Sequence, residues 1–526
     1  MTRQLMYTTR RGLVLAGLLA GALLFLPATP AGATSVTLTA PAIPGVAPLP
    51  GPVAAPATIP TTVGVLTVAP QTGVAGTPIT ISDTGLPAGQ TVTITWSTAV
   101  NTWVLDPEPG TVNYLGRAST AENVVLATTT TNSSGAFSVT LNTPNDWGGL
   151  HEIYAVVGGV EVASGGLVID RTATISPTSG PIGTPITITY HGLGASLYEG
   201  GGSLLWDNHY VGALTANWTR GTAKVVIRAA GPVGEHTIQI ADAITFMYMN
   251  IQQSPLPWAT GSTFKFRVTK GTGAPKPQID WPANVAPTIS AITTLQQAGL
   301  SGSGDGVTAS LASTRGPVDT SVALTASGLT PNVPVDMAWA TVVGSRVNCT
   351  STCWAFVTTP LGTPTASGSG SLQTSITVPD GLGGWHVVQL IQNGQTKAQI
   401  PFYILRSVVG AGVSSAVLKE GQKFTVHLKG LGWTQLDNTI AVDYDNSYIG
   451  YGCGFNSNGD TVMNLVATGG PGVHLIDMYP LLYNLSPSFA NTPYGMVPFL
   501  TYAQDYPGLA VGYQLPAIRL AITIVK

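Results

Sequence analysis

The sequence predicts an all-β chain, and three observations support this. Short stretches alternate Thr with Ile, Val or Leu, as in Thr184–Tyr190 (TPITITY), and alternation at period two is typical of strands with one buried face and one face in water. The 63 Gly and 39 Pro among the 526 residues place turn signals between these stretches. No long stretch shows the period of a helix. We therefore expect strands throughout, joined by turns.

One pattern occurs four times along the chain. Its clearest copy, Pro177–Asn208, has a Pro/Gly turn, an alternating strand, a Gly-Leu pair and a second strand that contains Trp206. The other copies open at Pro70, Ser313 and Gly410. Every copy then has a large aromatic residue in its second strand and a histidine in a late strand: Trp96, Trp206, Trp339 and Tyr444, and His151, His236, His386 and His474. Repetition at a regular interval predicts an array of one structural unit.

The spacing of the copies indicates which unit is repeated. Successive openings lie about 100 residues apart, with one wider gap of about 136. Seven or so short strands in about 100 residues are typical of an immunoglobulin-like β-sandwich. The second and fourth copies also share a motif, Trp206–Gly212 (WDNHYVG) and Tyr444–Gly450 (YDNSYIG). The prediction is four tandem immunoglobulin-like β-sandwich domains arranged as two homologous pairs.

The opening of the second copy, PTSGPIGTPITITYHGLG, resembles the start of IPT/TIG-type immunoglobulin-like domains. The late strand with its histidine is similar to that of many bacterial surface repeats. The resemblance is best over residues 171–240, moderate over 64–170 and 307–405, and thin after 406. It implies adhesive or spacer roles at the cell surface, or accessory modules on secreted carbohydrate enzymes, and it implies no catalytic residues.

The first residues are typical of an export signal. Arg3, Arg10 and Arg11 flank the start of an apolar run over Gly12–Leu26, and Ala31-Gly32-Ala33 is a small-residue cleavage site. We expect cleavage after Ala33, by the general secretory route rather than the twin-arginine route, and a secreted, cell-surface location. The expected organisation is a signal peptide (1–33), an Ala/Pro/Thr-rich linker (34–63), immunoglobulin-like domains 1 and 2 (64–170 and 171–270), a Gly/Ser/Pro-rich linker (271–306), and domains 3 and 4 (307–405 and 406–526).

The chain carries little charge: 9% of its residues are charged, against about 25% in a typical protein. Without the three arginines of the signal, 18 basic and 24 acidic residues remain. No cluster of Lys and Arg could form the basic face that a nucleic acid requires, and no second apolar run has the length of a membrane span. We therefore expect no nucleic-acid partner and no transmembrane anchor in the mature chain, and we favour self-association or contact with other components of the cell envelope.

The four repeated histidines suggest metal binding or catalysis, but one histidine in each separate domain lies too far from the others to share a metal ion. We expect each imidazole to pack at a strand end and bond a turn carbonyl, and each repeated tryptophan to belong to a core. Motifs for serine, zinc or nucleotide chemistry are missing from the sequence. The sequence predicts no catalytic residues, no enzyme activity and no cofactor, apart from the calcium considered next.

Asp207, Asp443 and Asp445 are weak candidates for calcium ligands, because calcium prefers carboxylate oxygens. Turn formation is the favoured interpretation, since an Asp-Asn pair at Asp207 and at Asp445 routinely bonds its own backbone. Cys349 and Cys353 are close enough in sequence for a possible disulfide across a tight loop. Cys453 is then a buried thiol, or pairs with either of the other two.

Two loops that follow histidine strands, over 243–258 and 479–513, are rich in aromatic residues and proline. Because loops run over the surface, these side chains need a cover. They cover a neighbouring domain, pack the second and fourth copies together, or bind a partner or glycan, and we favour packing or assembly. The possible interface residues are Phe246, Tyr248, Trp258, Tyr483, Phe489, Tyr494, Phe499, Tyr502 and Tyr506.

The favoured function is that of an exported structural or adhesive protein of the cell surface, a spacer or subunit of an extracellular layer, filament or envelope. Exposed edge strands could then add to a neighbour's sheet. The alternative is a secreted carbohydrate- or protein-binding module that uses its aromatic-rich loops. A secreted enzyme is the least favoured of the three.

Overall fold

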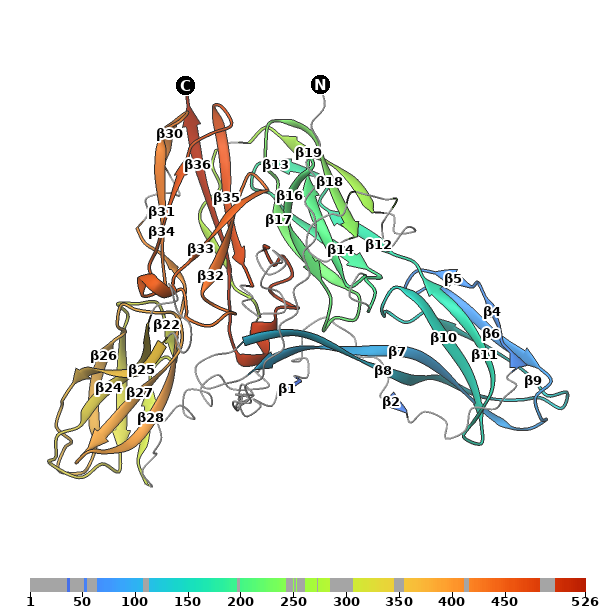
Figure 1. Ribbon diagram of the computed structural model, residues 1–526, viewed down its shortest axis with the longest axis horizontal. Helices are drawn as coiled ribbons and strands as arrows, with labels where there is room; N and C mark the ends of the chain where they lie inside the picture. Colours follow the sequence, from blue (N-terminus) through green and yellow to red (C-terminus); the bar gives the residue numbers. More distant parts are fainter. Residues whose placement is uncertain are drawn as a thin grey trace, which may run out of the picture. The chain divides into compact units, whose positions relative to one another are not determined.

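The computed structural model describes residues 36–37, 52–53, 64–106, 113–195, 199–242, 249, 252, 261–271, 273–283, 306–344, 354–410, 416–482 and 497–526. These residues belong to one compact unit, Ser35–Lys526. Within them the chain is all-β, as predicted, with strands joined by turns and short 3-10 helices such as η1 (Phe455–Ser457) and η4 (Pro507–Val511) (Figure 1).

The region with the clearest repeat folds into two sheets, which we name the second sandwich. Its smaller sheet has the order β12 (Thr172–Ser176), β14 (Pro185–His191) and β17 (Ala223–Arg228). Its larger sheet has the order β13 (Ser179–Pro181), β19 (Ser262–Thr269), β18 (Gly234–Asp242), β15 (Gly201–Trp206) and β16 (His209–Thr215). Two such sheets over one core make an immunoglobulin-like sandwich.

The same order of strands recurs, so that four regions of the described chain share it. The smaller sheet of the first sandwich has the order β4 (Thr67–Ala69), β6 (Pro78–Thr84) and β9 (Ala136–Asn142). Its larger sheet has the order β5 (Thr72–Gly73), β11 (Val160–Ile169), β10 (Gly149–Val157), β7 (Thr91–Asp106) and β8 (Asn113–Thr130). The smaller sheet of the third sandwich has the order β21 (Thr308–Leu311), β23 (Ser321–Ser327) and β26 (Leu372–Thr377). Its larger sheet has the order β22 (Arg315–Gly316), β28 (Gln395–Ile404), β27 (Gly384–Gln392), β24 (Asp336–Gly344) and β25 (Trp354–Gly362).

The fourth sandwich closes the series. Its smaller sheet has the order β29 (Ser407–Val408), β31 (Lys423–Lys429) and β34 (Thr461–Val466). Its larger sheet has the order β30 (Val417–Lys419), β36 (Ala517–Val525), β35 (Gly472–Pro480), β32 (Thr439–Tyr444) and β33 (Ser447–Cys453). In all four sandwiches the last hairpin of the larger sheet has a register shift just before the repeated aromatic residue. The shift lies between the second and the first residue that precede it. An irregularity at one shared position indicates that the sandwiches are copies of one pattern.

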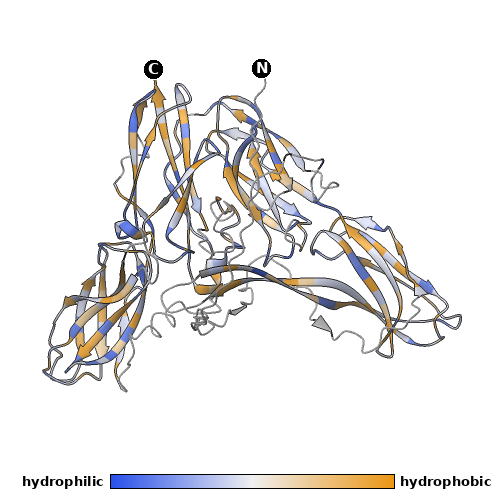
Figure 2. Cartoon of the chain, viewed as in Figure 1, coloured by the Kyte–Doolittle hydropathy of each residue, from blue (hydrophilic) through white to orange (hydrophobic). Residues whose placement is uncertain are grey.

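Alternation along the strands forms the cores. In β14, Ile186, Ile188 and Tyr190 are at most 1% exposed, whereas the intervening Thr187 and Thr189 lie on the partly exposed face. Figure 2 shows this alternation of hydrophobic and hydrophilic residues along the strands. Full burial of one such aliphatic side chain contributes about 1.5–3 kcal/mol. The repeated tryptophans Trp96, Trp206 and Trp339 are at most 2% exposed, which confirms their predicted place in the cores.

Three short strands outside the repeated pattern add to two of the sheets. β1 (Val36–Thr37) pairs with β7, and β2 (Pro52–Val53) pairs with β8. β20 (Gln278–Asp280) pairs with β36 of the fourth sandwich. All three lie in segments predicted as linkers, so at these positions the predicted linkers form strands. The hairpin of β7 and β8 is much longer than its counterparts (Figure 1).

Candidate functional site at the junctions between sandwiches

Each repeated histidine stacks on the repeated aromatic residue of its sandwich. In the second sandwich the rings of His236 and Trp206 are 5.2 Å apart, and Nε2 of His236 donates to the carbonyl oxygen of Pro232 at 2.8 Å. The other three histidines likewise donate to the carbonyl four residues earlier, at 2.7–2.9 Å: His151 to Trp147, His386 to Leu382 and His474 to Gly470. The predicted structural role, with packing at a strand end and a bond to a turn carbonyl, is confirmed.

The second ring nitrogen separates the sandwiches into two types. In the first and third, Nδ1 of His151 and of His386 faces a backbone carbonyl, that of Ser97 at 2.7 Å and of Ala340 at 3.2 Å. Burial lowers the pKa of His386 to about 4, so this ring is neutral at physiological pH. The alternation of types along the chain agrees with two homologous pairs.

In the second and fourth sandwiches an aspartate takes the place of that carbonyl. Asp207 Oδ2 lies 2.6 Å from Nδ1 of His236, and its Oδ1 accepts the N–H of Thr237 at 2.8 Å. Asp445 makes the same pair of contacts with His474 and Leu475. Although burial opposes the charge on His474, its bond to Asp445 raises the pKa above the usual value.

The Asp-Asn pairs form the turns that the sequence favoured. Asp207 and Asn208 have φ of 49° and 66°, and Asp445 and Asn446 have 49° and 60°. Two successive residues with positive φ are typical of the two-residue hairpin turn of type I′, where Asn and Asp are preferred. These carboxylates are therefore occupied in a turn and a histidine contact within one sandwich.

Charged side chains are buried between the second and fourth sandwiches. Arg228 of β17 binds Asp477 of β35, with Nη2–Oδ1 at 2.5 Å and Nε–Oδ2 at 3.2 Å. Nη1 of Arg519 in β36 lies 3.3 Å from Asp477 Oδ2, and its Nε donates to Asp280 of β20 at 2.9 Å. Arg228, Asp477 and Arg519 are at most 6% exposed. Because buried charges need partners, these bonds couple the two sandwiches.

Bonds to the backbone complete the charged junction. Nη2 of Arg228 donates to the carbonyl of Leu520 at 2.6 Å, and Nη2 of Arg519 donates to that of Val226 at 2.9 Å. Each arginine therefore reaches the backbone of the opposite sandwich. Nη1 of Arg519 also donates to the Tyr479 hydroxyl at 2.6 Å, and its guanidinium lies 4.8 Å from the centre of the Tyr479 ring.

Asp443 lies beside this junction without joining it. It is fully buried, directly opposite Asp477 on the neighbouring strand, and neither of its carboxyl oxygens has a hydrogen-bond partner among the described residues. Burial, and then the charge of Asp477, raise its pKa well above the usual value, while Arg519 opposes the shift. Burial therefore works against ionisation of this carboxyl.

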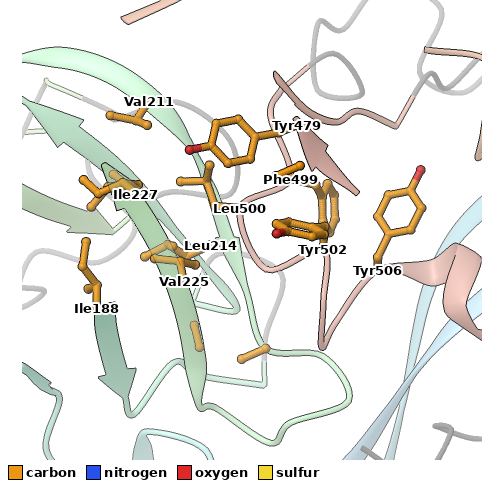
Figure 3. Packing of buried hydrophobic residues seen from close by; sticks show 14 of the residues in the cluster. Ile188, Val211, Leu214, Val225, Ile227, Tyr479, Phe499, Leu500, Tyr502 and Tyr506 are labelled. Atoms are coloured by element: carbon orange, nitrogen blue, oxygen red, sulfur yellow. The ribbon is translucent and has the colours of Figure 1, made fainter. Parts of the chain in front are cut away.

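The segment Val497–Val511, which we name the clasp, joins the fourth sandwich to the edge of the second. Its Pro498 and Leu500 exchange backbone hydrogen bonds with Ala213 of β16, at 2.9 and 3.0 Å. Gly212 allows this approach, because a Cβ there would lie 2.7 Å from Leu500 Cγ and 2.8 Å from the oxygen of Pro498. Figure 3 shows Leu500 close to Leu214 and Tyr479. The edge of β16 is therefore covered by the chain itself.

A buried carboxylate fastens the clasp. The two oxygens of Asp505 accept the backbone N–H groups of Asn217 and Trp218, both at 2.7 Å. Asp505 is fully buried, and burial raises its pKa to about 6. Tyr506 donates its hydroxyl to the carbonyl of Leu436 at 2.5 Å, which links the clasp to the fourth sandwich as well.

The predicted interface residues are only partly described. Phe499, Tyr502 and Tyr506 are at most 9% exposed and belong to the core that the clasp shares with the second and fourth sandwiches. The three side chains lie among residues of the second and fourth sandwiches, and the ring of Phe499 is also 6.2 Å from that of Trp103 in the first. The other predicted residues lie outside the described part of the chain: Phe246, Tyr248, Trp258, Tyr483, Phe489, Tyr494, Cys349 and Cys353. Cys453 ends β33 and is exposed, so the expectation of a buried thiol at this position was wrong.

Sequence reasoning missed Arg228, Asp477, Arg519 and Asp505. A signal for two of them was present, because Asp477 and Arg519 interrupt the apolar runs Leu475–Met478 and Ile518–Leu520 in a chain with few charges. A charge inside an apolar strand requires a buried partner. The identity of the partner was not readable, since Arg228 and Asp477 are 249 residues apart.

Within the described ranges, no group of three or more His, Cys, Asp or Glu side chains is arranged to hold a metal ion. Asp207 and Asp445 each contact a histidine ring, and Asp443 is buried. Calcium binding by these three aspartates stays a prediction. No described helix has the length and apolar character needed to cross a membrane.

Comparisons with known proteins give no family. No family model and no curated protein matches the chain. Among solved structures it is similar to an α2-macroglobulin mutant from Salmonella, with 8% identity over 88% of this chain and 31% of that chain and a TM-score of 0.16. It is also similar to the Escherichia coli adhesin FdeC, with 14% identity, 65% and 96% coverage and a TM-score of 0.15.

A third match is a putative membrane anchored protein from Corynebacterium diphtheriae, with 13% identity, 65% and 89% coverage and a TM-score of 0.16. The chain thus spans about a third of the length of the macroglobulin and most of the other two. Likeness at TM-scores this low carries no argument about function, and the immunoglobulin-like arrangement rests on the order of the strands.

Proposed function

We propose that this chain is an exported, non-enzymatic structural or adhesive protein of the cell surface, built from IPT/TIG-type sandwiches. The observation that carries the proposal is the pair of buried junctions, the charged one at Arg228 and Asp477 and the clasp at Asp505. Flexible strings of domains meet through small and polar contacts. Here charged groups and aromatic residues are buried at the contacts, as suits a rigid spacer or subunit.

The export signal predicted in residues 1–33 and the low charge support an extracellular place for such a spacer. The alternative, a module that binds carbohydrate or protein through exposed aromatic loops, loses the support of Phe499, Tyr502 and Tyr506, because these three side chains are buried within the chain. We therefore propose that the aromatic clasp serves the cohesion of the molecule.

Labelling of intact cells tests this function. A membrane-impermeant amine reagent should modify exposed lysines such as Lys265 on whole cells of the source organism, while a cytosolic protein of the same cells stays unlabelled. Modification of the chain only after lysis would contradict the proposed location. Mass spectrometry of the labelled chain should also show that residues 1–33 are missing.

A further inference from the structure

The third sandwich has a hairpin that extends beyond its sheet. β24 pairs with β27 from Asp336 to Ala340, whereas its pairing with β25 continues to Gly344. The first sandwich has the same feature in longer form, since β7 pairs with β10 only over Thr93–Trp96 but with β8 as far as Asp106. In the third sandwich the outer strand of this hairpin, β25, is the last strand of its sheet, whereas in the first sandwich β2 lies beyond the outer strand β8.

The repeated aromatic residues place the two outer strands in register. Trp96 lies opposite Val124 of β8, and Trp339 lies opposite Thr359 of β25. Val124 and Asn123 therefore correspond to Thr359 and Thr358. In the first sandwich β2 pairs with these two positions, Pro52 with Val124 and Val53 with Asn123.

The second sandwich covers its last strand with a different segment of the chain, at a position further along that strand. There the last strand, β16, exchanges backbone hydrogen bonds with Pro498 and Leu500 of the clasp. Extended backbone is thus what covers this edge in two of the sandwiches. Among the described strands, Ala355–Thr359 of β25 pair with β24 and with no further strand.

β25 has the composition of a strand that accepts another strand. Its sequence WAFVTTPLG contains no charged residue, and Ala355, Thr358 and Thr359 are exposed. Natural edge strands are commonly protected by lysine, by other charges or by proline, and here only Pro360 serves in that way. An uncharged edge of β-branched and aromatic residues favours further pairing.

Pro360 also indicates the direction of the backbone donors. A proline in an edge strand lies where its missing N–H would point away from the sheet. Because successive residues of a strand alternate, Thr358 and Phe356 direct their N–H groups the same way, away from β24. The segment Ala355–Thr359 therefore presents the N–H and C=O groups of these two residues to a further strand.

We infer that the outer edge of β25, over Ala355–Thr359, is an association surface that pairs antiparallel with the same strand of a second copy of this chain. Such pairing about a two-fold axis uses one surface on both copies and closes as a dimer. The uncharged strand meets its own copy without repulsion and offers nothing to a charged partner. The inference deepens the proposed structural function, on which it rests, by naming a partner and the strand that binds it.

Residues 34–526 and the variant Thr358→Pro test the inference by light scattering and by hydrogen exchange at several concentrations. The wild type should dimerise, with slower exchange of the Phe356 and Thr358 amides as the concentration rises. Thr358→Pro removes an outward donor on each copy, and the dissociation constant should rise about tenfold or more, since two hydrogen bonds are lost across the axis. Thr358→Lys should weaken the dimer at low salt and less so at high salt, because like charges then face each other.

Thr325→Lys is the matched control, an exposed threonine on the central strand β23 of the same sandwich, and it should leave the dimer unchanged. Equal melting temperatures of all variants would show that they fold. A wild type that stays monomeric, or β25 amides protected equally at every concentration, would overturn the inference and leave the proposed location untouched. A dimer insensitive to Thr358→Pro would also overturn it, although self-association would stand.

Discussion

Asp443 and Asp477 lie opposite each other on β32 and β35, yet their carboxyl groups have different surroundings. Asp477 is bound by Arg228 and Arg519, whereas both oxygens of Asp443 lack hydrogen-bond partners in the described structure. Removal of one partner from a buried ion pair is costly, about 3–5 kcal/mol, because the other charge stays buried. Removal of a carboxyl that has no partner costs nothing comparable.

The two aspartates should therefore respond oppositely to the same substitution. Asp477→Asn should lower the free energy of unfolding by about 3 kcal/mol or more, while Asp443→Asn should leave it unchanged or raise it. Urea unfolding of both variants at pH 8 measures the difference. Because the folded-state pKa of Asp443 is raised, the stability that this group contributes is lost as pH rises through that pKa. The free energy of unfolding of Asp443→Asn should therefore exceed that of the wild type most at alkaline pH. A loss of stability in Asp443→Asn equal to that in Asp477→Asn would contradict this account.

At the scale of the element, the clasp depends on a carboxylate with a raised pKa. Its folded pKa of about 6 lies above the ordinary value of 3.8, so the folded protein binds the proton of Asp505 more tightly than the unfolded chain does. This contribution to stability is full below pH 3.8 and is lost as pH rises through about 6. Over that window it amounts to on the order of 3 kcal/mol.

Asp505→Asn should accordingly flatten the pH dependence. Between pH 7 and pH 4 the wild type should gain stability relative to Asp505→Asn, as measured by the difference between their melting temperatures at each pH. Hydrogen exchange at pH 7 should also be faster for the Asn217 and Trp218 amides in the variant, since an amide oxygen replaces a carboxylate that accepts both. Asp83→Asn is the control, because among the described residues this carboxylate accepts just the neighbouring N–H of Thr84. Parallel pH profiles for wild type and Asp505→Asn would refute the role of Asp505.

Elements were the level at which sequence reasoning worked best. Period-two alternation located strands such as β14. The place of Trp206 in a central strand predicted its burial in the core, and the separation of His236 from the other repeated histidines favoured a turn contact over a shared metal. The clasp was recognised only as a loop whose aromatic residues need a cover. Its docking on β16 relies on Gly212 and on bonds from Asp505 to residues 287 and 288 positions away, and no local pattern encodes a contact of that range.

At the scale of the whole molecule, the charged junction joins two sandwiches that alternate with others along the chain. The second and fourth sandwiches bind each other through Arg228 and Arg519, although the third lies between them in sequence. Two units that share buried charges lose those contacts together, so their unfolding should be coupled. A chain of independent units would unfold in separate steps.

Arg228→Ala tests this coupling by calorimetry and hydrogen exchange. In the wild type, the amides of β17 in the second sandwich and of β35 and β36 in the fourth should exchange through one shared opening, with the same free energy. In Arg228→Ala the two sets should separate, because Asp477 keeps only Arg519 and the carbonyl of Leu520 loses its donor. Arg267→Ala, an exposed arginine on β19 of the second sandwich, should preserve the shared opening. Separate openings already in the wild type would mean that the sandwiches are linked without being coupled, and the rigid spacer would give way to a flexible one.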